Sequence, residues 1–97
     1  MPTYVTLLKF TKKGIESIKD APKRVEAARQ MAKAGGADIK GVYYTMGRYD
    51  AVVISEAPDD ETAVRLSIGG AMQGNVTSET LRAFPDSEFM KIVESLP

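Results

Sequence analysis

Residues 41–56 are the part of this sequence that most restricts its fold. Two runs rich in β-forming residues lie on either side of Gly47-Arg48. Glycine at the first central position suits a two-residue type II′ turn, because only glycine takes a positive φ there without strain. The sequence therefore predicts a tight β-hairpin whose first strand ends at Met46 and whose second strand begins at Tyr49.

Both faces of this hairpin are predicted to be covered. The pairing places Tyr44 opposite Ala51 and Tyr43 opposite Val52, and paired residues share a face. One face carries Val42, Tyr44, Met46, Tyr49, Ala51, Val53 and Ser55; the other carries Tyr43, Thr45, Asp50, Val52, Ile54 and Glu56. A sheet with one wet side should alternate cleanly between apolar and polar residues, and this pair does not. Because a chain of 97 residues can cover only one side with its own helices, we expect a second copy on the other side.

The remaining periodicity predicts an α+β domain that spans residues 1–97. Alternating residues predict strands over 3–10 and 76–84, and helical spacing predicts helices at 20–34, at 58–72 and after Pro85. The order is βαββαβ with a short C-terminal helix, which is the ferredoxin-like arrangement. Right-handed crossovers favour an antiparallel four-stranded sheet of order 4-1-3-2 with the helices on one face.

Two features of the helices have alternative interpretations. The lysines and arginines of the first helix predict a solvated face, with phosphate binding as the alternative. Gly69-Gly70 lies inside the second helix, where each glycine should weaken the helix by roughly 1 kcal/mol. The pair indicates either close packing against the sheet or space for a ligand. The last helix has an apolar stripe that needs a docking site on this chain or on a neighbour.

Composition excludes several classes of function. The chain has 13 basic and 13 acidic residues, so we expect no nucleic-acid and no membrane-surface partner. It has no Cys and no His, so we expect no metal site, no cofactor and no thiol nucleophile. No basic leader or long apolar run is present, and we expect a soluble, cytoplasmic protein.

The residues around the predicted turn resemble a known family. Gly47-x-Tyr49-Asp50 is followed by an apolar run at 51–54, and matching segments occur at 56–60, 74–76 and 80–84. In this order they resemble the GYD-domain family, which is named for its Gly-Tyr-Asp signature. The resemblance implies a dimeric α+β barrel, in which ferredoxin-like protomers pack sheet against sheet. It therefore implies a homodimer or a higher homo-oligomer through the helix-free face, and it implies no activity.

Three functions remain open at this level. The first is a binding protein for a small molecule in a cleft between sheet and helices, with ligand-binding residues Tyr43, Arg48, Tyr49, Asp50 and Arg82. The second is a cofactor-independent isomerase, lyase or monooxygenase, in which burial raises the pKa of Asp50 so that it serves as the base and Tyr49 or Tyr43 donates a proton. The third is structural: Gly47 makes the turn, Tyr49 packs, and the Asp50 carboxylate satisfies backbone groups. Whether the protein is an enzyme is left undecided.

Overall fold

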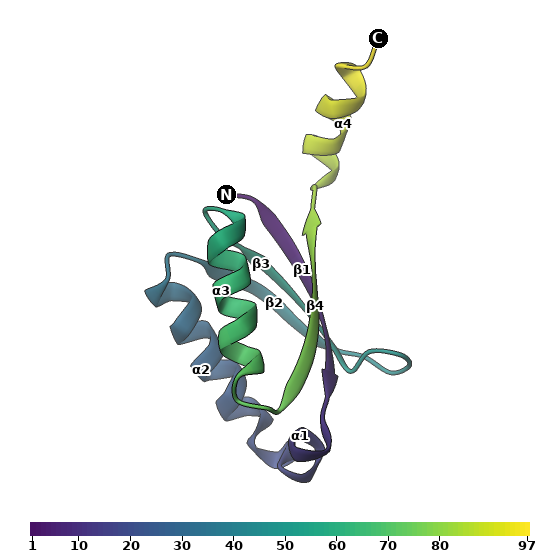
Figure 1. The fold of residues 1–97 in the computed structure, drawn as a ribbon. Helices are drawn as coiled ribbons and strands as arrows, with labels where there is room; N and C mark the ends of the chain where they lie inside the picture. Colours follow the sequence, from purple (N-terminus) through teal and green to yellow (C-terminus); the bar gives the residue numbers. More distant parts are fainter.

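The computed structural model describes all residues from 1 to 97 and contains four strands, four α-helices and one 3-10 turn (Figure 1). In chain order the elements are β1 (Thr3–Phe10), α1 (Lys12–Glu16), η1 (Ile18–Asp20), α2 (Ala21–Ala34), β2 (Asp38–Tyr44), β3 (Ala51–Glu56), α3 (Asp60–Ala71), β4 (Val76–Ala83) and α4 (Asp86–Glu94). No helix is both long enough and apolar enough to cross a bilayer.

The sheet has the predicted topology. Its order is β2-β3-β1-β4, and every neighbouring pair is antiparallel. Read from the other edge, this is the predicted order 4-1-3-2, so the α+β ferredoxin-like fold is confirmed. The two central strands, β1 and β3, are the strands whose sequences are apolar on both sides.

The hairpin has the predicted register but a longer loop. Tyr43 pairs with Val52 and Tyr44 with Ala51, and Gly47 has a φ of 105°. The strands nevertheless end at Tyr44 and restart at Ala51, so the prediction of a two-residue loop is wrong. Thr45 explains part of the difference, because its hydroxyl donates to the Tyr49 carbonyl at 2.6 Å and thereby closes a wider loop.

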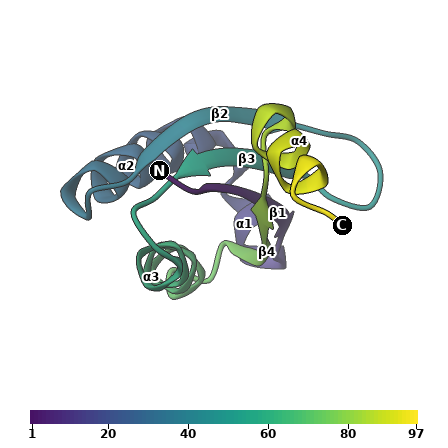
Figure 2. The same ribbon diagram turned by 90° about the horizontal axis from the view of Figure 1, so that it is seen from above.

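Helices α2 and α3 lie on the same side of the sheet, and the other side carries no helix (Figures 1 and 2). The covered face is the one that presents Tyr4, Thr6, Val42, Ala51 and Val53. Only 9 of 97 residues are buried, and the buried core cluster consists of Tyr4 with Ala32, Ala37, Ala57 and Ala63. Because four of these five side chains are alanines, the two helices pack on the sheet through small contacts.

Specific polar contacts fix the start of helix α3. The Tyr4 hydroxyl donates to the Asp60 carboxylate at the start of α3, and this hydrogen bond raises the pKa of Tyr4 above its ordinary value. Asp59 caps the same helix by accepting from the Thr62 amide at 2.8 Å and from the Thr62 hydroxyl at 2.7 Å. These bonds hold the pKa of Asp59 below its usual range. Asp20, the residue that precedes α2, makes no such side-chain bond.

Helix α4 extends away from the rest of the chain (Figure 1). Its stripe of Phe89, Ile92, Val93 and Leu96 is between 41% and 64% exposed. The predicted apolar stripe is therefore present, and this chain provides no docking site for it.

The connection between β1 and α2 approaches the start of β4 closely at Gly14. Thr11 donates its amide to the Asn75 carbonyl at 3.0 Å and its hydroxyl to the Gly74 carbonyl at 2.6 Å. Gly14 lies in the short helix α1. A Cβ at Gly14 would lie 2.1 Å from the Asn75 carbonyl oxygen, so only glycine fits without movement of the backbone.

We therefore expect Gly14→Ala to lower the free energy of unfolding by about 1–3 kcal/mol, the usual range for overpacking. Gly70→Ala is the matched control, since a Cβ there has no neighbour within 4 Å. That control should raise stability by about 0.5–1 kcal/mol, because glycine weakens a helix interior. Urea unfolding of both variants measures the difference. Equal stability of Gly14→Ala and the parent would contradict the close approach.

Candidate functional site

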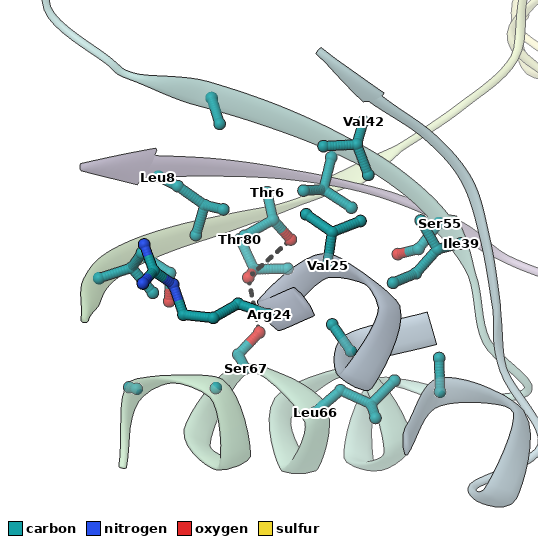
Figure 3. A pocket seen from close by; sticks show the side chains of 18 of the residues that line it. Thr6, Leu8, Arg24, Val25, Ile39, Val42, Ser55, Leu66, Ser67 and Thr80 are labelled. Carbon is teal, nitrogen blue, oxygen red and sulfur yellow. Dashed lines mark hydrogen bonds between the residues drawn. The ribbon is translucent and has the colours of Figure 1, made fainter. Parts of the chain in front are cut away.

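A cavity of about 200 Å³ lies between the covered face of the sheet and helices α2 and α3 (Figure 3). The helices contribute mostly small residues to its walls, namely Ala21, Ala28, Ala32, Ala63, Gly70 and Ala71. The sheet contributes larger apolar groups, among them Leu8, Ile39, Val42 and Val53. Side chains this small do not fill the space above the sheet, so a hollow remains where a typical core would be solid.

The two glycines of α3 have different surroundings. A Cβ at Gly69 would lie 3.1 Å from the Met31 sulfur of α2, so this glycine allows the two helices to approach each other. A Cβ at Gly70 would meet nothing within 4 Å, and Gly70 lines the cavity. Gly69 therefore fits the interpretation of close packing, although it packs against a helix rather than the sheet. Gly70 fits the interpretation of open space.

Three hydroxyl groups in the cavity wall form a chain of hydrogen bonds from α3 to the sheet. The Ser67 and Thr80 hydroxyls are 2.8 Å apart, and the Thr80 and Thr6 hydroxyls are 3.2 Å apart (Figure 3). Each hydroxyl can donate once and accept twice, so this chain of two hydrogen bonds leaves acceptor sites unused. The arrangement can bind a polar group of a ligand that is otherwise apolar.

Arg24 of α2 is the charged residue among those that line the cavity. Its Nη1 donates to the Ser17 carbonyl at 2.9 Å and to the Ser17 hydroxyl at 3.2 Å. Its Nη2 donates to the Gly14 carbonyl at 3.4 Å. These bonds fix the guanidinium at the end of the cavity where α2 begins.

Arg48 and Tyr49, from the loop between β2 and β3, lie on the opposite side of the sheet from the cavity, beside Leu7 and Lys9. The Tyr49 hydroxyl donates to a Glu79 carboxylate oxygen at 2.8 Å, and this hydrogen bond raises the pKa of Tyr49. Lys9 Nζ and Arg48 Cζ each lie 5.6 Å from the centre of the Tyr49 ring. Tyr49 is thus on the helix-free side, although simple alternation predicts it on the side of Tyr44. The chain leaves the regular ladder at the loop, so alternation does not extend to residue 49.

Asp50 makes two hydrogen bonds to β1 at the end of the β1–β3 ladder. Its amide donates to the Leu8 carbonyl at 2.8 Å, and its carboxylate accepts from the Phe10 amide at 2.8 Å. The side chain therefore supplies the acceptor for a strand amide at the point where β3 turns away. This contact favours the structural role over the role of a base.

The signature loop and the order of elements agree with a match to the GYD domain family model over residues 4–93. The chain belongs to the GYD domain family. It is 31% identical over 91 residues to the "Glutamine synthetase and cystathionine beta-lyase binding protein" of Thermus thermophilus, and the match covers 93% of this chain and 96% of the relative. Its fold is similar to the crystal structure of TTHA0845, also from Thermus thermophilus, with a TM-score of 0.55 and 24% identity. That match covers 88% of this chain and 95% of the other.

None of the five residues predicted to bind a ligand lines the cavity of this GYD domain. Tyr43 is 62% exposed and pairs with Val52 on the helix-free face. Arg48 and Tyr49 form a shallow polar pocket there with Lys9, Thr77 and Glu79. Arg82 is exposed, and its guanidinium carbon lies 4.4 Å from the Phe84 ring centre. The structure therefore brings Arg48 and Tyr49 together and keeps Arg82 apart from them.

Sequence reasoning misses the polar groups of the cavity because they come from four separate elements. Thr6, Ser67 and Thr80 each look ordinary in their own strand or helix. Arg24 belongs to the basic residues predicted to be solvated, yet it lies three residues after Ala21 and four before Ala28. Those two spacings place Arg24 on the apolar stripe of the helix. This position is the feature of the sequence that could have indicated that Arg24 faces the cavity.

The contact of Asp50 predicts different effects for two substitutions. Asp50→Asn should keep the fold and the assembly state, because its amide oxygen can still accept from the Phe10 amide. Asp50→Ala should lower the free energy of unfolding by about 1–3 kcal/mol, since it leaves that amide unsatisfied. Denaturant unfolding with size-exclusion chromatography tests both variants. A large loss with Asp50→Asn would show that the negative charge itself is required.

Proposed function

We propose that this GYD domain binds a small, largely apolar molecule in the cavity between its sheet and helices α2 and α3. The observation that carries the proposal is an apolar cavity of about 200 Å³ with a few polar groups in its wall. Ligand sites have this composition: apolar walls give affinity, and a small number of fixed polar groups orient the ligand. A dry apolar cavity of about 150 Å³ already holds one benzene molecule, so this space suits one ring or a short hydrocarbon chain.

Filling the cavity from Gly70 tests this proposal. Octan-1-ol, a neutral probe, should bind once per chain in titration calorimetry. Gly70→Leu should weaken that binding at least tenfold, because a leucine displaces about two or three methylenes of ligand at about 0.8 kcal/mol each. Val64→Leu is the control, since Val64 is exposed on the same helix and does not line the cavity. Equal binding to the parent and to Gly70→Leu would reject the cavity as the site.

The protein acts, in our proposal, as a homo-oligomer that forms through its helix-free face. That face carries the apolar side chains Val5, Leu7, Val52, Ile54 and Leu81, which lie opposite one another in the strand register. The chain measures only 17 Å along its shortest axis, so no third layer covers this face. The exposed stripe of α4 adds a second apolar surface that a neighbouring copy can cover.

We expect sedimentation velocity to give a dimer or a larger species at micromolar concentration. Val52→Asp, in the middle of the helix-free face, should shift the protein to monomers, because an unpaired carboxylate would be buried in the interface. Val64→Asp places the same charge on an exposed position of α3 and should leave the assembly unchanged. A parent protein that sediments as a compact monomer would refute the proposal.

A second candidate function is the binding of metabolic enzymes, favoured by the name of the Thermus thermophilus relative. The exposed apolar stripe of α4 offers a surface of the amphipathic kind that binds in a partner's groove. Purified glutamine synthetase and cystathionine β-lyase are the direct probes, with surface plasmon resonance as the measurement. Binding that disappears in Ile92→Asp and persists in Val64→Asp would support this function, and no binding to either enzyme would exclude both as partners.

A further inference from the structure

We infer that the ligand of the cavity is an amphiphilic monoanion, a short hydrocarbon with one carboxylate that pairs with Arg24. This inference rests on the proposed function and specifies the chemical class of its ligand. The residues that line the cavity include no Asp and no Glu, and Arg24 is their single charged member. The net charge of the whole chain is zero, so this local imbalance does not follow from composition.

Arg24 has no counter-ion in the chain. The salt bridges of the structure join Lys12 to Glu16 and Lys40 to Asp38 and Glu56, and none involves Arg24. A cation beside apolar walls is unfavourable unless it is paired and hydrogen-bonded. A ligand carboxylate would supply the missing negative charge, whereas a ligand cation would add repulsion to the same place.

The guanidinium has donors left for such a ligand. Of its five N–H groups, Nη1 uses two on Ser17 and Nη2 uses one on Gly14, so the Nε–H and one Nη2–H have no acceptor in the chain. These two nitrogens lie along one edge of the guanidinium. A carboxylate can accept from both at once, and such bidentate pairs are the strong ones. The bonds to Ser17 and Gly14 hold the group in place before a ligand arrives.

The polarity of the walls gives the ligand a direction. Gln73, Asn75 and Ser78 join Arg24 at the end where α3 finishes and β4 begins. Ile39 and Leu66 line the walls away from this end, and the three linked hydroxyls lie between the two regions (Figure 3). The carboxylate is therefore placed at Arg24 and the hydrocarbon toward Leu66. One arginine balances one negative charge, so a monocarboxylate fits better than a phosphate.

Three probes of equal chain length test the inference in the unmodified protein. Octanoate should bind about tenfold more tightly than octan-1-ol, since a hydrogen bond to a charged group contributes more than a neutral one. Octylamine, which is a cation at neutral pH, should bind more weakly than octan-1-ol. In ¹⁵N spectra, octanoate should shift the Arg24 Nε signal, and octan-1-ol should leave it in place.

Substitution of Arg24 separates the contribution of the charge to ligand binding from the contribution of the cavity. Arg24→Gln should abolish the preference for octanoate and leave octan-1-ol binding, whereas Arg29→Gln should change neither. Arg29 is the matched control, because it also donates to a backbone carbonyl, that of Ile39 at 3.1 Å, and does not line the cavity. If Arg24→Gln does not fold, the ranking of the three probes and the Nε signal still decide the question.

Three outcomes would overturn the inference, and they differ in what they say about the proposed function. Equal binding of octanoate and octan-1-ol would reject an anionic ligand and leave an apolar binding cavity. A preference for octanoate that survives in Arg24→Gln would reject the pairing with Arg24 and would also leave that cavity. Failure of all three probes to bind removes the proposed cavity function as well.

Discussion

A four-stranded sheet whose central strands are apolar on both faces, in a chain that has two long helices, sets the limits on this structure. Helices α2 and α3 cover one face and leave the other without a layer (Figure 2). The low number of buried residues, 9 of 97, follows from this shortage of covering elements. Much of the apolar surface therefore stays exposed, and two of its regions are the helix-free face, with Tyr43 and Leu81, and the stripe of α4.

The small size of the residues on the two helices determines how much space remains between the helices and the sheet. Alanine and glycine dominate the helix surfaces that point to the sheet, so contacts at Ala32 and Ala63 hold the layers together while the space between them stays open. Polar bonds at the ends, such as Tyr4 to Asp60 and Thr11 to Gly74, fix the spacing between the layers. The cavity is therefore supported at its ends rather than filled at its centre.

Much of the fold could be predicted because it depends on short-range periodicity. Alternation in β1 and β3 revealed the central strands, and the pairing of Tyr44 with Ala51 followed from the position of Gly47. The face of Tyr49 could not be predicted, because the loop bond from Thr45 to the Tyr49 carbonyl takes residue 49 out of the alternation. The site was harder still. Arg24, Ser67 and Thr80 are far apart in the sequence, and they line one cavity only because α2 and α3 pack on the sheet that contains β4.

In the proposed binding function, Gly70 is the position at which a substitution in this chain would change the size of the ligand. Its backbone is ordinary helix and a Cβ there would meet nothing within 4 Å, so a larger side chain would extend into the space above the sheet. A chain with a larger residue at this position would then be expected to accept a shorter molecule on the same scaffold.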